Sequence, residues 1–183
     1  THFFNAMSPI HHREPGLAGA ALYSTELTVE VIADGFHIHP WMLGLIVQNK
    51  SVNLTCLITD AMSVMGFEDG IYESMGQKVK LESSTLESGR LSLADDPAVL
   101  AGSVLSMDRA VAGMINMVGI PLTDAVTMAS TTPAAVLGLQ NRKGRLEKDF
   151  DADIAVLDRL YNNQMTIVNG RIVYETDNPG KNT

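Results

Sequence analysis

The chain has 183 residues, of which 45% are hydrophobic and 19% are charged, a composition typical of a globular protein with a substantial core. Its 13 Lys and Arg residues are outnumbered by 21 Asp and Glu residues, and no basic cluster is present that would neutralise a run of phosphates. The resulting net charge of −8 argues against a nucleic acid as partner, and the apolar content argues against disorder.

The single cysteine, Cys56, lies in an apolar run and is interpreted as a core residue, because one thiol cannot form an internal disulfide. No apolar stretch reaches the roughly 20 residues that span a bilayer, and no charged-then-apolar leader opens the chain. We therefore expect a cytoplasmic protein without a membrane partner. Residues 1–7 are apolar, strand-like and lack an initiator Met, so we expect the chain to begin in mid-domain and the polar residues 175–183 to be a natural C-terminus.

Two short runs rich in Val, Ile and Leu, 27–33 and 54–59, lead to the acidic residues Asp34 and Asp60. They are typical of buried parallel strands. Between them, residues 40–47 predict a short helix with Pro at its first position. A strand–helix–strand unit makes a right-handed crossover in a parallel sheet, which brings both strand ends and both aspartates to one edge.

Residues 70–96 alternate more loosely, with Gly and Ser between the apolar runs, and predict a β-hairpin-like insertion. Beyond them, apolar residues recur every three or four positions over 104–118, which predicts a helix. A second helix is expected over 123–130. A third is expected over 132–138, with Thr132 as its N-cap and Pro at its first helical position.

The last part of the chain changes in character again. After Gly144, β-branched runs lie on either side of Asn169-Gly170, which is a strong hairpin signal. These strands predict a small separate β unit. We therefore divide the chain into an α/β part over 1–140, β strands over 141–176 and a tail over 177–183.

Few residues are suited to carry chemistry, namely five histidines and the strand-end acids Asp34 and Asp60. In a parallel α/β sheet or barrel, ligands bind beyond the carboxyl ends of the strands, where we expect His2, His37 and Asp60. Each residue also has a structural explanation. Most histidines are not metal ligands, a strand-end Asp often caps the next turn, and Arg13 would more often form a surface ion pair.

Several segments point to one family when they are taken together: Thr1–Met7, His12-Arg-Glu-Pro-Gly-Leu-Ala-Gly19, Ile32-Ala-Asp-Gly-Phe-His37, Leu57-Ile-Thr-Asp-Ala61, Leu100-Ala-Gly-Ser103 and Thr132-Pro-Ala-Ala135. Over nearly its whole length the chain resembles the N-acetylglucosamine-6-phosphate deacetylases of the amidohydrolase superfamily. Residues 144–157 are similar to the segment where many amidohydrolases re-enter their β-sandwich domain. The resemblance implies an α/β fold, the C-terminal part of a (β/α)8 TIM-type barrel with strands of a small β-sandwich.

The resemblance also implies an activity, the metal-dependent hydrolysis of the N-acetyl group of N-acetylglucosamine 6-phosphate to glucosamine 6-phosphate and acetate. His2 resembles a metal ligand, and Asp60 resembles the catalytic aspartate that takes a proton from water and delivers it to the departing nitrogen. A divalent ion is implied because amide hydrolysis needs an ionised water; zinc is expected, with iron, manganese and cobalt left open. Substrate-binding roles are implied for Asn5, Ala6, Arg13, Asp34, Gly35, Phe36, His37, Leu100, Ala101 and Gly102.

Arg13 is expected to bind the phosphate through two charge-assisted hydrogen bonds and, by the resemblance, to reach the neighbouring subunit's site, which implies a homodimer. A full barrel takes about 250 residues, and the family's other metal ligands belong to strands upstream of Thr1. We therefore expect this chain alone to be inactive. Two alternatives stay open: another amidohydrolase, such as a dihydroorotase-like or N-acyl-amino-acid deacylase enzyme, or a non-catalytic fragment that binds sugar phosphates.

Overall fold

The computed structural model describes residues 1–84 and 86–176. The first half of the chain contains α1 (Gly16–Tyr23), β1 (Val29–Ile32), α2 (Pro40–Asn49), the 3-10 turn η1 (Val52–Leu54), β2 (Thr55–Ile58), β3 (Gly70–Ser74), β4 (Gln77–Glu82) and β5 (Arg90–Leu93). The second half contains α3 (Met107–Gly113), η2 (Met114–Val118), α4 (Leu122–Val126), η3 (Thr127–Thr131), α5 (Thr132–Val136), β6 (Ile154–Leu157), β7 (Asn163–Val168) and β8 (Arg171–Glu175).

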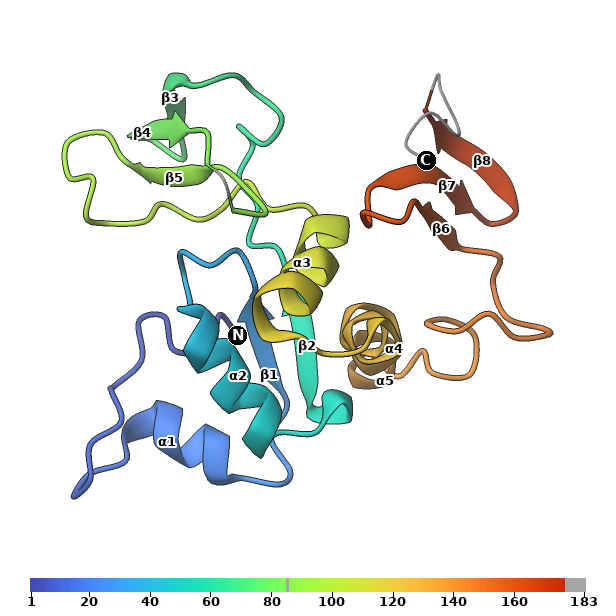
Figure 1. Ribbon diagram of the computed structural model, residues 1–183, viewed down its shortest axis with the longest axis horizontal. Coiled ribbons are helices and arrows are strands. Elements are labelled where there is room, and N and C mark those ends of the chain that lie inside the picture. The colour runs from blue at the N-terminus through green and yellow to red at the C-terminus, as the bar shows by residue number, and fades with distance from the viewer. Residues whose placement is uncertain (85, 177–183) are drawn as a thin grey trace.

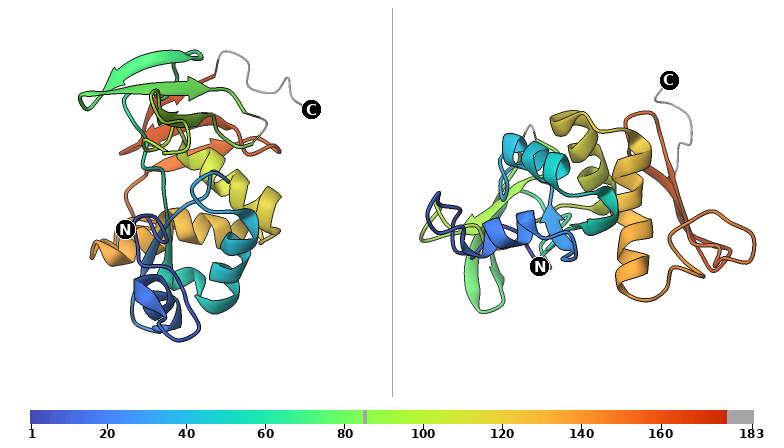
Figure 2. Two further views of the ribbon diagram at one scale, coloured as in Figure 1. Left: turned by 90° about the vertical axis from the view of Figure 1, so that its left-hand side faces the viewer. Right: turned by 90° about the horizontal axis from the view of Figure 1, so that it is seen from below.

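Within the described residues, the strands form a parallel pair, β1–β2, and two antiparallel sheets, β3–β4–β5 and β6–β7–β8. In Figure 1 the parallel pair lies beside α1 and α2, whereas the two antiparallel sheets lie at separate upper corners of the molecule. Figure 2 shows the same arrangement from two other sides. No described helix is both long enough and apolar enough to cross a membrane.

The predicted strand–helix–strand unit is confirmed, because β1 and β2 pair in parallel and α2 connects them. The helix begins at Pro40, and the N–H of Trp41 donates to Nδ1 of His39, which caps it, at 3.2 Å. Leu43 of the helix packs in the main core with the β1 and β2 residues. Since Ile32 is paired with Ile58, both strands end at the same edge.

The prediction of strand-like residues at the start of the chain is wrong. His2, Phe4 and Ala6 have φ angles of 35°, 72° and 55°, and residues 3–6 form a series of turns. The apolar residues have another role here: Phe3 is buried in the main core, and its N–H donates to the carbonyl oxygen of Glu30 in β1 at 2.7 Å.

The insertion after β2 consists of three strands, β3, β4 and β5, rather than a single hairpin. Alternate residues of β4 point to one side, and Val79 and Leu81 form a second small core with Val64 and Leu91. This sheet therefore has its own apolar layer, separate from the core that surrounds β1 and β2.

The first helix after the insertion begins at Met107, three residues later than the apolar spacing predicts. Val104 instead packs against the small core and Leu105 is buried in the main core, so both residues continue the preceding segment. The helix then widens into the π-helical turn η2 and ends at Gly119, whose φ of 81° suits a residue without a Cβ.

The predicted break between the next two helices is also wrong, because α4, η3 and α5 form one continuous helix over 122–136. Proline has no N–H and its ring crowds the carbonyl one turn earlier, so it normally disfavours a helix interior. Here the π-helical turn η3 comes just before Pro133, and its wider hydrogen-bond spacing accommodates the ring. Thr132 is not an N-cap, and its hydroxyl donates to the carbonyl oxygen of Val52 at 2.7 Å.

The predicted hairpin near the end of the chain is confirmed. Asn169 and Gly170, with φ angles of 50° and 74°, connect β7 to β8, and β6 completes the sheet. The division at residue 140 stays a prediction. The tail predicted for 177–183 lies outside the described residues.

Candidate functional site

The loop after β1 is organised by Asp34, whose side chain is 2% exposed. Its Oδ1 accepts the N–H groups of Phe36 and His37, each at 2.9 Å, and its Oδ2 lies 2.6 Å from Nδ1 of His37. Gly35 adopts a φ of 80°, and an added Cβ there would lie 3.1 Å from Leu86 and from Met117. The loop is therefore a tight turn that holds the His37 ring by one of its nitrogens.

Asp60 follows β2 and has a φ of 51°, a left-handed conformation that is unfavourable for a residue with a side chain. Its carboxylate is exposed, and no hydrogen bond to it is found among the described residues. Its carbonyl oxygen accepts the N–H of Ser103 at 3.0 Å, so the backbone is held although the carboxylate is free. The side chain is thus available for proton transfer.

The predicted substrate loop, residues 100–102, lies directly against this turn. An added Cβ at Gly102, which has a φ of 77°, would lie 2.6 Å from Cγ of Met62 and 3.2 Å from the carbonyl oxygen of Asp60. Ala61 and Ser103 also form a parallel bridge. The structure therefore brings two predicted parts of the site together, the catalytic aspartate and the Leu-Ala-Gly loop.

The predicted residues near the N-terminus lie beside β1, in the turns around the buried Phe3. Nδ1 of His2 lies 3.0 Å from the carbonyl oxygen of Asn5, and Nδ2 of Asn5 donates to the carbonyl oxygen of Phe3 at 3.1 Å. Ala6, with its φ of 55°, belongs to the same turns. These contacts fix the backbone that would present Asn5 and Ala6 to a ligand.

Arg13 lies apart from the other predicted site residues. It is exposed in the loop before α1, where its N–H donates to Nδ1 of His11 at 3.4 Å and His11 bridges to Glu14. Among the described residues, no hydrogen bond or ion pair joins the Arg13 guanidinium to the rest of the site. The structure therefore does not bring Arg13 together with the other predicted site residues.

The described residues do not provide a complete metal site. Among residues 1–84 and 86–176, no group of three or more His, Cys, Asp or Glu side chains is placed to hold a metal ion. His2 is one candidate ligand, and a catalytic zinc ion usually takes three protein ligands. The side chains in this chain therefore do not fit a tightly held ion on their own.

Cys56, in β2, plays no part in the site. It is 2% exposed, and burial, with the nearby Glu30 carboxylate, raises the pKa of its thiol above the ordinary value. A thiol that is buried and protonated is a poor nucleophile. The interpretation of Cys56 as a core residue is confirmed.

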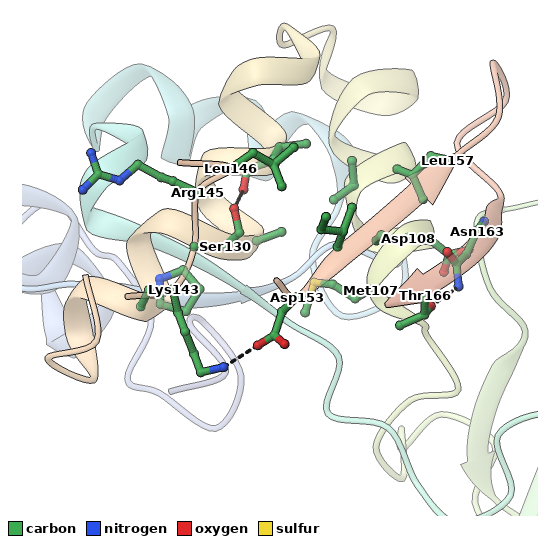
Figure 3. Close-up of a pocket in the computed structure, with 18 of the residues that line it drawn as sticks. Met107, Asp108, Ser130, Lys143, Arg145, Leu146, Asp153, Leu157, Asn163 and Thr166 are labelled. Carbon is green, nitrogen blue, oxygen red and sulfur yellow. Dashed lines mark hydrogen bonds and ion pairs between the residues drawn. The ribbon is translucent and has the colours of Figure 1, made fainter. Parts of the chain in front are cut away.

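A cavity of about 760 Å³ lies elsewhere, between the helix α4–η3–α5 and strands β6 and β7. Figure 3 shows Lys143 paired with Asp153 on one side of it and Asn163 beside Thr166 on another. None of the predicted site residues lines this cavity, which is mostly apolar. Asp34 and His37 instead follow β1, and Asp60 follows β2.

Comparison with known proteins decides the family. The model of the amidohydrolase family matches residues 1–173. The chain belongs to the amidohydrolase family. The predicted fold class, an α/β chain forming part of an amidohydrolase barrel, is thereby confirmed.

Relatives of this amidohydrolase chain include an N-acetylglucosamine-6-phosphate deacetylase of Bacillus subtilis (strain 168), 38% identical over 174 residues, which cover 95% of this chain and 42% of the relative. A putative N-acetylgalactosamine-6-phosphate deacetylase of Escherichia coli (strain K12) is 34% identical over 171 residues, covering 93% of this chain and 98% of the relative. The predicted resemblance to the deacetylases is confirmed.

Solved structures agree. The crystal structure of N-acetylglucosamine-6-phosphate deacetylase from Thermotoga maritima superposes with a TM-score of 0.86 at 33% identity, covering 96% of this chain and 46% of that protein. A mutant N-acetyl-D-glucosamine-6-phosphate deacetylase from Mycobacterium smegmatis, in complex with N-acetyl-D-glucosamine-6-phosphate, gives a TM-score of 0.85 at 33% identity. The match covers 94% of this chain and 44% of that protein. The chain thus spans less than half the length of most of these relatives. The E. coli K12 relative is an example of similar length.

Sequence reasoning assigned no role to Ser103, although it included this residue in one of the motifs. The structure buries it at 2% exposure and bonds it to the turn that carries Asp60. Its position directly after the Leu-Ala-Gly segment was the available signal. From the sequence alone such a serine would be taken as a surface residue. Only the fold shows that it lies beside the end of β2.

Proposed function

We propose that this chain is the C-terminal part of an enzyme that hydrolyses the N-acetyl group of N-acetylglucosamine 6-phosphate, giving glucosamine 6-phosphate and acetate. The observation that carries the proposal is the contact between the Asp60 turn and the 100–102 loop, at the end of β2. The names of the deacetylase relatives, together with the complex containing N-acetyl-D-glucosamine-6-phosphate, support the choice of substrate.

Asp60 would act first as base and then as acid. It takes a proton from the water whose oxygen attacks the acetyl carbon, and it delivers that proton to the nitrogen as the C–N bond breaks. An exposed carboxylate with no hydrogen-bond donor on it suits this exchange. Nδ1 of His37 is hydrogen-bonded to Asp34. This leaves Nε2 of His37 to contact the sugar, together with Gly35 and Phe36.

The phosphate is assigned to Asn5, Ala6 and Arg13. Guanidinium groups suit a phosphate because they donate two parallel charge-assisted hydrogen bonds. The exposed side chain of Arg13, which is unpaired among the described residues, supports a role in the neighbouring subunit's site, and hence a homodimer. One buried cysteine and no disulfide within the described part of the chain support a cytoplasmic enzyme.

Members of this family are generally metal-dependent, and we assign the metal as zinc with His2 as one ligand. The remaining ligands are not found in the described residues, so they would have to come from sequence outside the chain. The 183-residue chain by itself is therefore expected to be inactive, as is consistent with its covering 42% of the B. subtilis relative.

N-acetylgalactosamine 6-phosphate is a second candidate substrate, because two E. coli relatives at 34% identity carry that name. The two sugars differ only in the orientation of the hydroxyl at C4. A comparison of kcat/KM for the two phosphates decides between them.

The test uses the natural gene product, whatever its length, isolated with its flanking sequence and its metal. Its intact mass shows whether the gene product is heavier than the 19.7 kDa of the 183-residue chain. Asp60→Asn should reduce acetate release by about 100- to 10,000-fold. Asp95→Asn, at another exposed acid in the insertion, should not. Full activity in Asp60→Asn would overturn the assignment of Asp60.

Arg13→Met tests the phosphate. It should raise KM for the sugar phosphate and leave any hydrolysis of unphosphorylated N-acetylglucosamine unchanged. Equal effects on both substrates would favour a different amidohydrolase activity. Binding of the sugar phosphate by a gene product without acetate release would favour the non-catalytic alternative.

A further inference from the structure

Three hydrogen bonds connect Ser103 to the turn at the end of β2. Its hydroxyl donates to the carbonyl oxygen of Thr59, and its N–H donates to the carbonyl oxygen of Asp60 at 3.0 Å. Its own carbonyl oxygen accepts the N–H of Met62 at 2.9 Å. A single residue thus contacts the backbone before, at and after the predicted catalytic aspartate.

The same hydroxyl also holds Ser103 in place on its own side. It accepts the N–H of Leu105 at 3.1 Å, and Leu105 is fully buried in the main core. Ser103 is itself 2% exposed. The contact is therefore shielded from water. A hydrogen bond is stronger in such a buried environment than on the surface.

The turn needs such support because Asp60 has a φ of 51°. A residue with a Cβ keeps this conformation only when the surrounding structure imposes it. The neighbouring Gly102 packs closely on the same turn, since an added Cβ there would lie 2.6 Å from Cγ of Met62 and 3.2 Å from the carbonyl oxygen of Asp60. The backbone of Asp60 is thus held by the segment 102–103, while its carboxylate has no partner among the described residues.

We propose that Ser103 is a positioning residue for Asp60, which it holds in the left-handed conformation that points the carboxylate at the reacting water and nitrogen. This inference rests on the proposed role of Asp60. Ser103 touches no reacting atom itself. Its loss should therefore slow the chemical step more than it weakens substrate binding.

The test is Ser103→Ala in the natural gene product, with Ser92→Ala as a matched control. Ser92 is a fully buried serine in β5, and its hydroxyl has no hydrogen-bond partner within residues 1–84 and 86–176, so the control removes the same atom without breaking a hydrogen bond to the turn. Ser103→Ala should lower kcat by about 10- to 100-fold, the scale of a misplaced catalytic group, with a smaller change in KM. Ser92→Ala should leave both constants near the wild-type values.

A double-mutant cycle with Asp60→Asn separates positioning from general damage. If Ser103 acts through Asp60, Ser103→Ala should have almost no further effect on kcat once Asp60 has been replaced. An equal fall in kcat with and without Asp60 would overturn the proposal. If Ser103→Ala does not fold, Ser103→Cys decides, because a thiol is a weak donor of nearly the same size and should lower kcat without unfolding the protein.

Hydrogen exchange provides a readout that does not depend on activity. The amides of Met62 and Ser103 should exchange faster in Ser103→Ala than in Ser92→Ala. If the wild-type protein releases no acetate from either sugar phosphate, the proposed function fails. The exchange rates then decide whether Ser103 holds the turn, and unchanged rates would show that it does not.

Discussion

Nδ1 of His37 lies 2.6 Å from Oδ2 of Asp34, and both side chains are almost completely buried, at 7% and 2% exposed. The second oxygen of Asp34 accepts two backbone N–H groups from the same loop. A carboxylate that uses both oxygens within its own loop orients the imidazole ring and has little capacity left for a ligand. We infer that Asp34 serves the predicted sugar site through His37.

Asp34→Asn should lower the free energy of unfolding by about 1–3 kcal/mol, because an amide cannot replace the charge-assisted bond to His37 and leaves buried groups poorly paired. Urea unfolding measures the change. Asp96→Asn is the control, since the Asp96 side chain also accepts a loop N–H, from Ala98 at 3.2 Å, but on the surface. Equal losses of stability in the two variants would argue against a special role for the buried loop.

Gly113 allows α3 to pack against the residue that precedes Asp34. A Cβ at Gly113 would lie 2.4 Å from the carbonyl oxygen of Ala33, so Gly113→Ala should cost about 1–3 kcal/mol through overpacking. Gly44, in α2, is the matched helical glycine, with its nearest neighbour at 4.0 Å. Gly44→Ala should instead stabilise the chain by about 0.5–1 kcal/mol through helix propensity. Thermal unfolding of both variants should shift in opposite directions.

Sequence reasoning found the elements whose local signals agree with their packing. The runs 27–33 and 54–59 contain the strands β1 and β2, whose residues are mostly buried, and Asn169-Gly170 has the backbone conformation that its hairpin requires. It failed where tertiary contacts decide. In residues 1–7, Phe3 packs into the core from a series of turns and not from a strand. Pro133 is tolerated inside a helix because a π-helical turn comes just before it.

The candidate site could be predicted only in part for the same reason. Asp60, Asp34 and His37 could be proposed as candidates because they lie close in sequence to recognisable strands. Ser103 acts over a separation of 44 residues from Thr59, and no local pattern marks such a contact. The proposed phosphate role of Arg13 involves a second chain, which the fold of one chain cannot specify.

An ion-pair cluster connects the segment after α5 to the start of β6. Lys143 contacts Asp151 and Asp153, and Arg142 contacts Asp151 at 2.8 Å. These hydrogen bonds lower the pKa of both aspartates below 3.8, so their contribution to stability is present above pH 3.8 and is lost as the pH falls through the lowered pKa values. The difference in urea midpoint between wild type and Lys143→Met should shrink on acidification. It should also shrink in high salt, because the side chains of the cluster are partly exposed to solvent. A salt-independent difference would contradict this account.

Lys50 is a charged group that folding buries, with 4% of its surface exposed. Its Nζ donates to the carbonyl oxygens of Ser24 and Leu27, each at 2.6 Å, which ties the end of α2 to the segment before β1. Burial lowers the pKa of this ammonium below 10.5. Between the lowered pKa and 10.5 the unfolded chain binds more protons than the folded one, so the free energy of unfolding should rise with pH in that window.

The measurement is urea unfolding at intervals from about pH 8 up to 10.5, comparing wild type with Lys50→Met. Lys50→Met should be less stable by about 1–3 kcal/mol near neutral pH, because two carbonyl groups lose their donor. Its stability should also lack the alkaline rise. Lys78→Met, at an exposed lysine of β4, should keep that rise, because the Lys50 ammonium is still present. A parallel pH dependence in all three proteins would mean that the Lys50 ammonium is solvated as well in the folded chain as in the unfolded one.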